Sequence, residues 1–352
     1  MYRINLSHIF EKIHRGIINM IIKQCTFLFL GILALPVMAD KSISERSTGS
    51  TPQYEYNNVH SQDLSASAYL NGVIYLGADG GKNSNFPEVR QTTLNELDNP
   101  AKILVRKLVQ RDIEGATQLG DEIYITSSLS QVNEDTGDYR VLSAFNIDEK
   151  GDVDSERYVY ARDLILNGLK AHFGDNAWFR RVSVSFGKTG GLNVEGLTAS
   201  HNNPQSVIMG LRSPLWHESF GSPKLEPTLS LNKGDAILVE ISKPFSALPE
   251  LTVKTIDLAG QGIRGIEYIP ALKGYVVISG SVQKMNLYSL WFYEPISGET
   301  RLLSKNNDSF SQLCRPESIL NIPNTSIFYV LSEESGTACT NSKFNYVSYD
   351  YK

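Results

Sequence analysis

One polar residue recurs at the same point of five similar segments, and four of these five residues are charged. They are Ser65, Glu114, Glu195, Arg264 and Glu317, and the intervals between them are 49, 81, 69 and 53 residues. Three carboxylates and one guanidinium are costly to bury together unless they pair with each other or bind a metal ion. The pattern therefore leaves three hypotheses: an ion pair between Arg264 and a glutamate that locks the structure, a metal site, or a site that contacts a substrate.

The residue types indicate which ligands such a site would take. Clustered carboxylate oxygens suit Ca²⁺ or Mg²⁺ better than Zn²⁺, which prefers His and Cys, so Glu114, Glu195 and Glu317 are the candidate metal ligands and Ca²⁺ is the candidate ion. Arg212, in the sequence GLRSPL, would favour an anionic ligand such as a phosphate or a carboxylate. The alternative is that Arg212 is an ordinary solvated arginine. The candidate ligand-binding residues are therefore Glu114, Glu195, Arg212, Arg264 and Glu317.

The segments that carry these residues are each predicted to form two antiparallel strands. They read DLSASAYLNGVIYLGADG (63–80), DIEGATQLGDEIYITSSLS (112–130), NVEGLTASHNNPQSVIMGLRS (193–213), GIRGIEYIPALKGYVVISGS (262–281) and PESILNIPNTSIFYVLSEES (316–335). In each, a polar turn with Gly or Asn separates two apolar runs, which is typical of a β-hairpin. Gly115, Gly196 and Gly265 follow the recurring residue in three segments, which indicates that the strands crowd together there.

Further strand-like stretches raise each unit to about four strands. They lie at 89–94, 102–109, 140–146, 156–160, 236–241, 251–258, 287–293 and 299–303. Repeated four-stranded units are typical of an all-β fold, the β-propeller. We expect five blades, with six as the alternative if one unit is hidden within residues 140–190. The longer units contain insertions, with a short helix predicted at 161–173 and a long loop at 213–235.

This fold would bring the recurring residues together. The innermost strand opens each blade of a propeller, so their side chains would converge around the central channel. The last unit supplies only about three strands, at 319–322, 327–332 and 344–351. Because an unpaired edge strand invites aggregation, the ring needs a fourth. We expect residues 52–60 to supply it beside the C-terminal strand.

Residues 1–39 are predicted to be a secretory signal peptide. The apolar run TFLFLGILALPV (26–37) is too short to span a bilayer, and it is followed by small residues before Asp40. The stretch before it is long for a signal peptide, so translation from Met20 is one alternative and an uncleaved N-terminal anchor is another. We expect a periplasmic or secreted protein with no stable membrane span after cleavage.

The mature chain is expected to have a flexible polar leader at 40–60 and a single propeller domain at 61–352. Removal of the signal peptide also removes Cys25 and leaves Cys314 and Cys339. Two cysteines in an exported chain predict one disulfide, here in the closing blade. Two separate buried thiols are the alternative, since pairing depends on a geometry that the sequence does not show.

Composition excludes several classes of function. The chain is 41% hydrophobic and 20% charged, so it can bury a sizeable core and is neither wholly disordered nor a polytopic membrane protein. Its net charge is −5, and loss of the signal peptide makes it more negative, which argues against a nucleic-acid partner. The G-x-S-x-G, H-E-x-x-H and C-x-x-C motifs do not occur in the sequence.

A resemblance to a known family supports the same architecture. The segments DIEGATQLGDEIYITSSLS, GLNVEGLTASHNNPQSVIMGLRSPL and GIRGIEYIPALKGYVVISG resemble a bacterial family of exported proteins of unknown function. That family is similar to the phytase-like and esterase-like β-propellers. The resemblance covers roughly residues 60–350, and residues 193–215 are its most specific stretch.

The resemblance implies a propeller whose E-G-[AL] motifs, here at Glu114 and Glu195, lie near the channel. Calcium-dependent phytases of this fold use acidic clusters to hold Ca²⁺ and phosphate. This chain departs from that pattern, because Ser65 and Arg264 replace glutamate in two units. We therefore expect a monomeric binding module for a small or anionic ligand, with a polar channel that can hold a divalent cation. A Ca²⁺-dependent phosphoric or carboxylic ester hydrolase is the alternative.

Overall fold

The computed structural model describes residues 42–49, 55–56, 59–60, 64–78, 88–96, 102–103, 112–130, 141–148, 152–218, 234–282, 287–304, 308–333, 339 and 345–352. The predicted signal peptide lies outside these residues, as does part of the predicted leader. No helix in the described part of the chain is long and apolar enough to cross a membrane.

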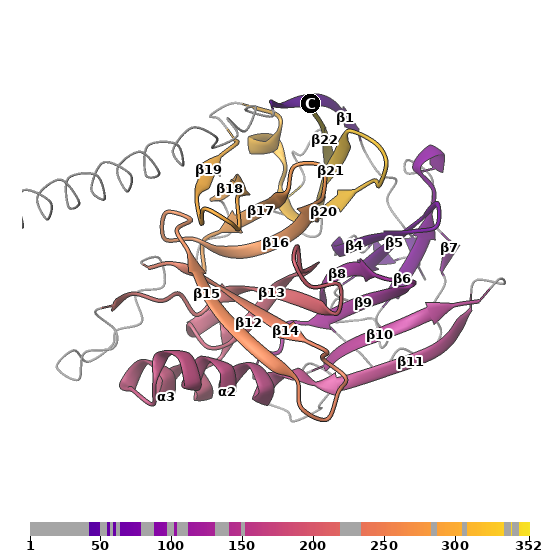
Figure 1. Ribbon diagram of the computed structural model, residues 1–352. Helices are drawn as coiled ribbons and strands as arrows, with labels where there is room; N and C mark the ends of the chain where they lie inside the picture. The colour runs from indigo at the N-terminus through magenta and orange to yellow at the C-terminus, as the bar shows by residue number, and fades with distance from the viewer. Residues whose placement is uncertain are drawn as a thin grey trace, which may run out of the picture. The chain divides into compact units, whose positions relative to one another are not determined.

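The described strands form a five-bladed β-propeller, as the repeats predict, in which each blade is a four-stranded antiparallel sheet (Figure 1). Blade 1 contains β4 (Leu64–Leu70), β5 (Val73–Ala78), β6 (Glu88–Thr92) and β7 (Lys102–Ile103). Blade 2 contains β8 (Ile113–Leu119), β9 (Glu122–Ser127), β10 (Val141–Ile147) and β11 (Val153–Tyr160). Blade 3 contains β12 (Asn193–Ala199), β13 (Ser206–Ser213), β14 (Ala236–Ser242) and β15 (Glu250–Ile256). Blade 4 contains β16 (Gly262–Ile269), β17 (Gly274–Gly280), β18 (Tyr288–Tyr293) and β19 (Thr300–Leu302).

Blade 5 closes the ring with strands from both ends of the propeller. Its order is β20 (Arg315–Asn321), β21 (Ile327–Glu333), β22 (Tyr346–Tyr351) and β1 (Ile43–Gly49). The prediction that residues 52–60 supply the closing strand is wrong, because β1 takes that place beside β22. Among the described residues, β2 (Glu55–Tyr56) and β3 (Val59–His60) form a separate two-stranded sheet. The propeller therefore begins at Ile43 rather than at residue 61, and part of the predicted leader belongs to the fold.

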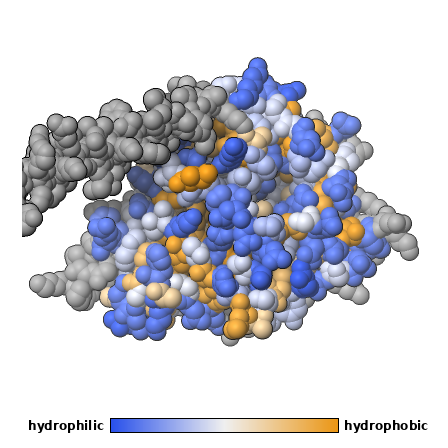
Figure 2. Space-filling view, viewed as in Figure 1, coloured by the Kyte–Doolittle hydropathy of each residue, from blue (hydrophilic) through white to orange (hydrophobic). Residues whose placement is uncertain are grey.

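The five innermost strands pack side by side in a closed ring, in the order β4, β8, β12, β16, β20 and back to β4. The inner strands of a blade lie between neighbouring blades, so they are buried on both faces and read as nearly continuous apolar runs. All seven residues of β17 are buried. The outer strand β11, in contrast, is largely exposed. The surface in view is mostly polar, with scattered apolar residues (Figure 2).

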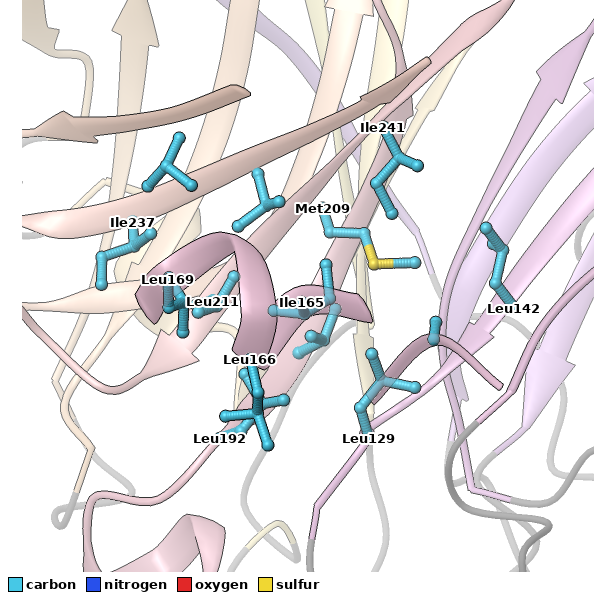
Figure 3. Packing of buried hydrophobic residues seen from close by; sticks show 14 of the residues in the cluster. Leu129, Leu142, Ile165, Leu166, Leu169, Leu192, Met209, Leu211, Ile237 and Ile241 are labelled. Carbon is cyan, nitrogen blue, oxygen red and sulfur yellow. The ribbon is translucent and has the colours of Figure 1, made fainter. Parts of the chain in front are cut away.

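The insertion between β11 and β12 is helical, which removes the alternative of a sixth blade within residues 140–190. Helix α2 (Ala161–Phe173) has the predicted bounds, and a second helix, α3 (Ala177–Val184), follows it. The Asn176 side chain caps α3 by accepting a hydrogen bond of 2.9 Å from the Phe179 amide. Apolar residues of α2, including Ile165 and Leu169, pack with Met209 of blade 3 in one hydrophobic cluster (Figure 3).

Cys314 and Cys339 form the predicted disulfide. Cys314, just before β20, is bonded to Cys339, and their Cα atoms lie 5.4 Å apart. The bridge therefore belongs to blade 5, where the two ends of the propeller meet.

Candidate functional site

The five recurring residues share one backbone feature. In every blade the pairing between the first and second strands skips one residue of the first strand, and these residues are Ser65, Glu114, Glu195, Arg264 and Glu317. In blade 3 the pairing also skips Arg212 on the second strand. A β-bulge of this kind re-aims a side chain. Because each bulge lies near the start of an inner strand, the five positions share one level at one end of the channel, which we call the channel mouth.

A small residue after each bulge lets the inner strands approach closely. A methyl group on Gly115 would lie 2.8 Å from the Leu197 Cβ atom, and one on Gly265 would lie 2.5 Å from the carbonyl oxygen of Glu317. These distances confirm the crowding that the sequence predicts. Residues of all five inner strands, among them Ser65, Glu195 and Glu317, line a shallow pocket of about 190 Å³ with its solvent-open space included.

Arg264 joins three blades through ion pairs. Its Nε atom lies 3.0 Å from Glu195 Oε2, and one of its terminal nitrogens contacts Glu317 Oε1. The exposed fractions of Glu195, Arg264 and Glu317 are 4%, 6% and 6%, so these charges are almost wholly removed from water. Buried charges persist only when they are paired, and Arg264 supplies the countercharge for both carboxylates.

Glu195 also binds the second predicted arginine. Arg212 donates a hydrogen bond of 2.7 Å to Glu195 Oε1, and Asn193 donates one of 2.9 Å to the same atom. Burial alone would lower the pKa of the Arg212 guanidinium, but the charges of Glu195 and Glu114 outweigh burial and raise the pKa. Arg212 is therefore held in its charged form, and it is not an ordinary solvated side chain.

Ser65 and Glu114 lie on the other side of the ring and have different roles. Ser65 Oγ donates a hydrogen bond to the carbonyl oxygen of Ile113 and so joins blades 1 and 2. Glu114 is only partly buried and acts on Arg212 through its charge. Glu195, Arg212, Arg264 and Glu317 are thus connected by ion pairs, and Glu114 lies near enough for its charge to act on Arg212.

Tyr288 is a further member of the site that the sequence analysis does not find. Its ring lies beside Arg264, with 5.6 Å between the guanidinium carbon and the ring centre. Burial raises the pKa of the Tyr288 phenol, although the charges of Arg264, Arg212 and Arg315 act to lower it. Tyr288 lies outside the five repeated segments, so only the packing of strands within blade 4 reveals its place.

Four buried polar atoms of this cluster have no hydrogen-bond partner among the described residues. They are Glu195 Oε2, Arg212 Nε, Arg264 Nε and Tyr288 Oη. The first and third are 3.0 Å apart, so they attract each other as charges although they are poorly aligned for a hydrogen bond. The remaining two, Arg212 Nε and Tyr288 Oη, are donors. Buried polar atoms without a protein partner commonly bind water or a ligand.

The described residues contain no group of three or more His, Cys, Asp or Glu side chains arranged to hold a metal ion. Glu195 and Glu317 are instead paired with arginines. The calcium site at Glu114, Glu195 and Glu317 stays a prediction.

Fold and site together define a five-bladed propeller with a buried network of charges at the channel mouth. No model of a known protein family matches the chain. A comparison with curated proteins likewise finds no significant match. The argument for function therefore rests on the residues of the site itself.

Proposed function

We propose that this protein is an exported ligand-binding module whose site is the channel mouth and whose ligand carries an acidic group. The observation that carries the proposal is the pair of unpartnered donors, Arg212 Nε and Tyr288 Oη. Both are buried beside charged arginines, so a carboxylate or a phosphate oxygen is the acceptor that would best satisfy them.

The ion pairs favour binding over hydrolysis. A metal-assisted hydrolase needs carboxylates that hold the ion with an open coordination position. Here Arg264 and Arg212 together balance the charges of Glu195 and Glu317, and Arg212 Nε is an unsatisfied donor in a fixed position. A site fixed in advance loses little entropy when its ligand binds.

Two features support export. The disulfide between Cys314 and Cys339 is typical of proteins that leave the reducing cytosol. The apolar run at 26–37, followed by small residues, has the form of a signal peptide. N-terminal sequencing of the secreted protein should begin at Asp40.

The test is calorimetric titration of the mature protein with small carboxylic acids and phosphate monoesters, each beside its uncharged ester or amide. We expect the acids to bind and the uncharged partners to bind at least about tenfold more weakly, as loss of a charge-assisted hydrogen bond implies. Tyr288→Phe, which removes only the hydroxyl group, should also weaken binding of the acids.

The matched control is Arg157→Gln, because Arg157 also pairs with a glutamate, at 2.5 Å from Glu122, but on the exposed side of blade 2. It should leave affinity unchanged, while Arg212→Gln should abolish it. Equal binding of acids and their uncharged analogues, or full affinity in both Arg212→Gln and Tyr288→Phe, would contradict the proposal.

A further inference from the structure

The helical insertion is basic, although the chain as a whole is acidic. The stretch 170–188 contains four Lys or Arg residues and one acidic residue, Asp175, whereas the net charge of the chain is −5. This stretch covers the end of α2, all of α3 and most of a 3₁₀ turn, η3 (Gly187–Thr189). The two helices lie together between blades 2 and 3 in the sequence and belong to neither sheet (Figure 1). The repeat that builds the propeller therefore does not explain this charge.

One face of α3 is buried and the opposite face is exposed. The buried face belongs to the hydrophobic cluster that also contains residues of blades 2 and 3. The exposed face carries Arg180, Arg181 and Val184. Because Val184 follows the two arginines by four and three residues, the three side chains are neighbours on the helix surface. The Val184 side chain is 67% exposed, so an apolar group lies in water beside two guanidinium groups.

Phe186 extends the exposed apolar surface beyond the end of α3. It is 44% exposed, and only Ser185 separates it from Val184 in the sequence. Its backbone is held in place, because the Phe186 carbonyl oxygen accepts hydrogen bonds of 2.9 Å from the amides of Thr189 and Gly191. Single exposed apolar residues are common on proteins, but grouped ones often mark an interaction site.

Asp175 offsets only part of the positive charge. Its carboxylate lies 3.0 Å from Lys170 Nζ and 3.7 Å from Arg180 Nη1, so one negative charge is shared between two positive ones. All three side chains are about half exposed or more, and water weakens ion pairs at such positions. The surface therefore keeps a net positive charge that can act on an anionic partner.

The turn that follows Phe186 packs beside the channel mouth. A methyl group on Gly187 would lie 2.9 Å from the Asn193 Cβ atom, and Asn193 donates a hydrogen bond to Glu195. Ser213 Oγ also donates a hydrogen bond of 3.1 Å to the Gly187 carbonyl oxygen. The basic surface is therefore attached to the same end of blade 3 as the channel mouth.

We propose that the surface formed by Arg180, Arg181, Val184 and Phe186 docks on a bilayer that contains anionic lipids. The arginines would pair with lipid phosphates, and the two apolar side chains would enter the boundary between headgroups and acyl chains. Four side chains are far fewer than the roughly 20–30 residues that each partner contributes to a stable protein interface, which favours a lipid surface over an acidic protein. The docking surface is independent of the ligand proposed for the channel mouth.

Cosedimentation of the mature protein with lipid vesicles tests this proposal. The protein should bind vesicles of phosphatidylcholine mixed with phosphatidylglycerol and should bind pure phosphatidylcholine vesicles at least about tenfold more weakly. Binding should also weaken as salt is added, because salt screens exposed charges.

Variants locate the docking surface. Arg180→Gln combined with Arg181→Gln should weaken binding at least about tenfold, since each arginine near an anionic surface contributes roughly fivefold. Phe186→Ser should also weaken binding, and its melting temperature should stay close to that of wild type. The matched controls are Arg46→Gln, on the exposed strand β1, and Leu248→Ser, at a leucine that is 87% exposed between β14 and β15. Both should bind like wild type.

Arg212→Gln separates docking from ligand binding, since it should abolish binding at the channel mouth and leave vesicle binding intact. Loss of vesicle binding in Arg212→Gln would overturn the docking proposal, because the lipid phosphate would then be held at the channel mouth. The proposal is also overturned if the protein does not bind phosphatidylglycerol vesicles at low salt, or if binding survives unchanged in both the double-arginine variant and Phe186→Ser.

Discussion

Gly280 makes room for the two side chains that build the channel mouth. A methyl group at this position would lie 2.9 Å from Arg264 Cγ and 3.1 Å from Tyr288 Cδ1. Real side chains almost never approach so closely, so a larger residue would push the guanidinium away from Glu195 or Glu317. The absence of a side chain at Gly280 thus leaves the space in which Arg264 reaches Glu195 and Glu317.

Glu267 provides a residue-scale prediction of pH dependence. It lies on β16, three residues beyond Arg264, and its carboxylate accepts a hydrogen bond of 3.3 Å from Thr198 Oγ1 on β12. Burial raises the pKa of Glu267 to about 8, although this hydrogen bond acts to lower it. The folded protein therefore keeps the carboxyl protonated at a pH where the unfolded chain, with a usual value of about 4.5, has lost the proton.

Stability should consequently fall as pH rises from about 4.5 to about 8, because only the unfolded state releases the proton in that interval. Glu267→Gln should remove this part of the pH dependence and give a higher melting temperature than wild type at pH 8. Thermal denaturation of both proteins between pH 5 and pH 8 is the measurement. A wild-type curve that stays parallel to the variant's over this interval would contradict the assignment.

At the scale of elements, strands with strong apolar patterns could be predicted and the polar closing strand could not. The third strand of blade 4 is predicted at 287–293 and found at Tyr288–Tyr293, because its sequence YSLWFY is rich in aromatic residues, which favour strands. Strand β1 reads ISERSTG, and all but its two ends are exposed. It is held by backbone pairing to β22 and by polar contacts such as Ser47 to Ser348, at 2.7 Å. No pattern in the sequence encodes such a strand.

The same contrast applies to the site. Glu195 and Glu317 are found from the sequence because the bulge recurs at a fixed place in each repeat. Tyr288 is not found, because its contact with Arg264 depends on how the strands of blade 4 pack. Asn193 is not found either, because its hydrogen bond to Glu195 on the same strand accompanies an irregular register that the sequence does not show. Likewise, the sequence leaves open whether Arg264 pairs with a glutamate, and only the observed distances decide this.

Deletion of residues 40–49 tests the role of β1. Without β1 the edge of β22 would be unpaired, and exposed strand edges associate with other chains. We expect the truncated protein to melt at a lower temperature and to form dimers or larger aggregates, measured by size-exclusion chromatography with light scattering. A substitution on the exposed surface of β1, Arg46→Gln, removes only the 3.3 Å ion pair with Asp350 and is the control. A truncated protein that stays monomeric and melts like wild type would show that β1 is dispensable.

For the whole molecule, polar contacts join consecutive blades and so oppose opening of the ring. Arg264 links blades 3, 4 and 5. Ser67 and Ser318 join blades 5 and 1 through hydroxyl oxygens 2.5 Å apart. Ser130 donates to Asn193 at 2.8 Å between blades 2 and 3. Because the inner strands pack one after another around a closed ring, the stability of the ring depends on every junction, and Arg264 contributes to two of them.

Replacing Arg264 therefore tests both the stabilising role of its ion pairs and the predicted calcium site. Arg264→Met leaves Glu195 and Glu317 without their shared countercharge, and breaking a buried ion pair costs about 3–5 kcal/mol. The melting temperature should fall by about 10 °C. Adding Glu317→Gln to this variant should restore much of the loss, because Glu195 keeps its ion pair with Arg212 and Glu317 then carries no charge. Millimolar Ca²⁺ should leave wild type unchanged, since Arg264 occupies both carboxylates, and should stabilise Arg264→Met, in which they are released. Stabilisation of wild type by Ca²⁺ would instead mean that the carboxylates hold the ion beside the arginine, and the hydrolase hypothesis would then be favoured over the binding module.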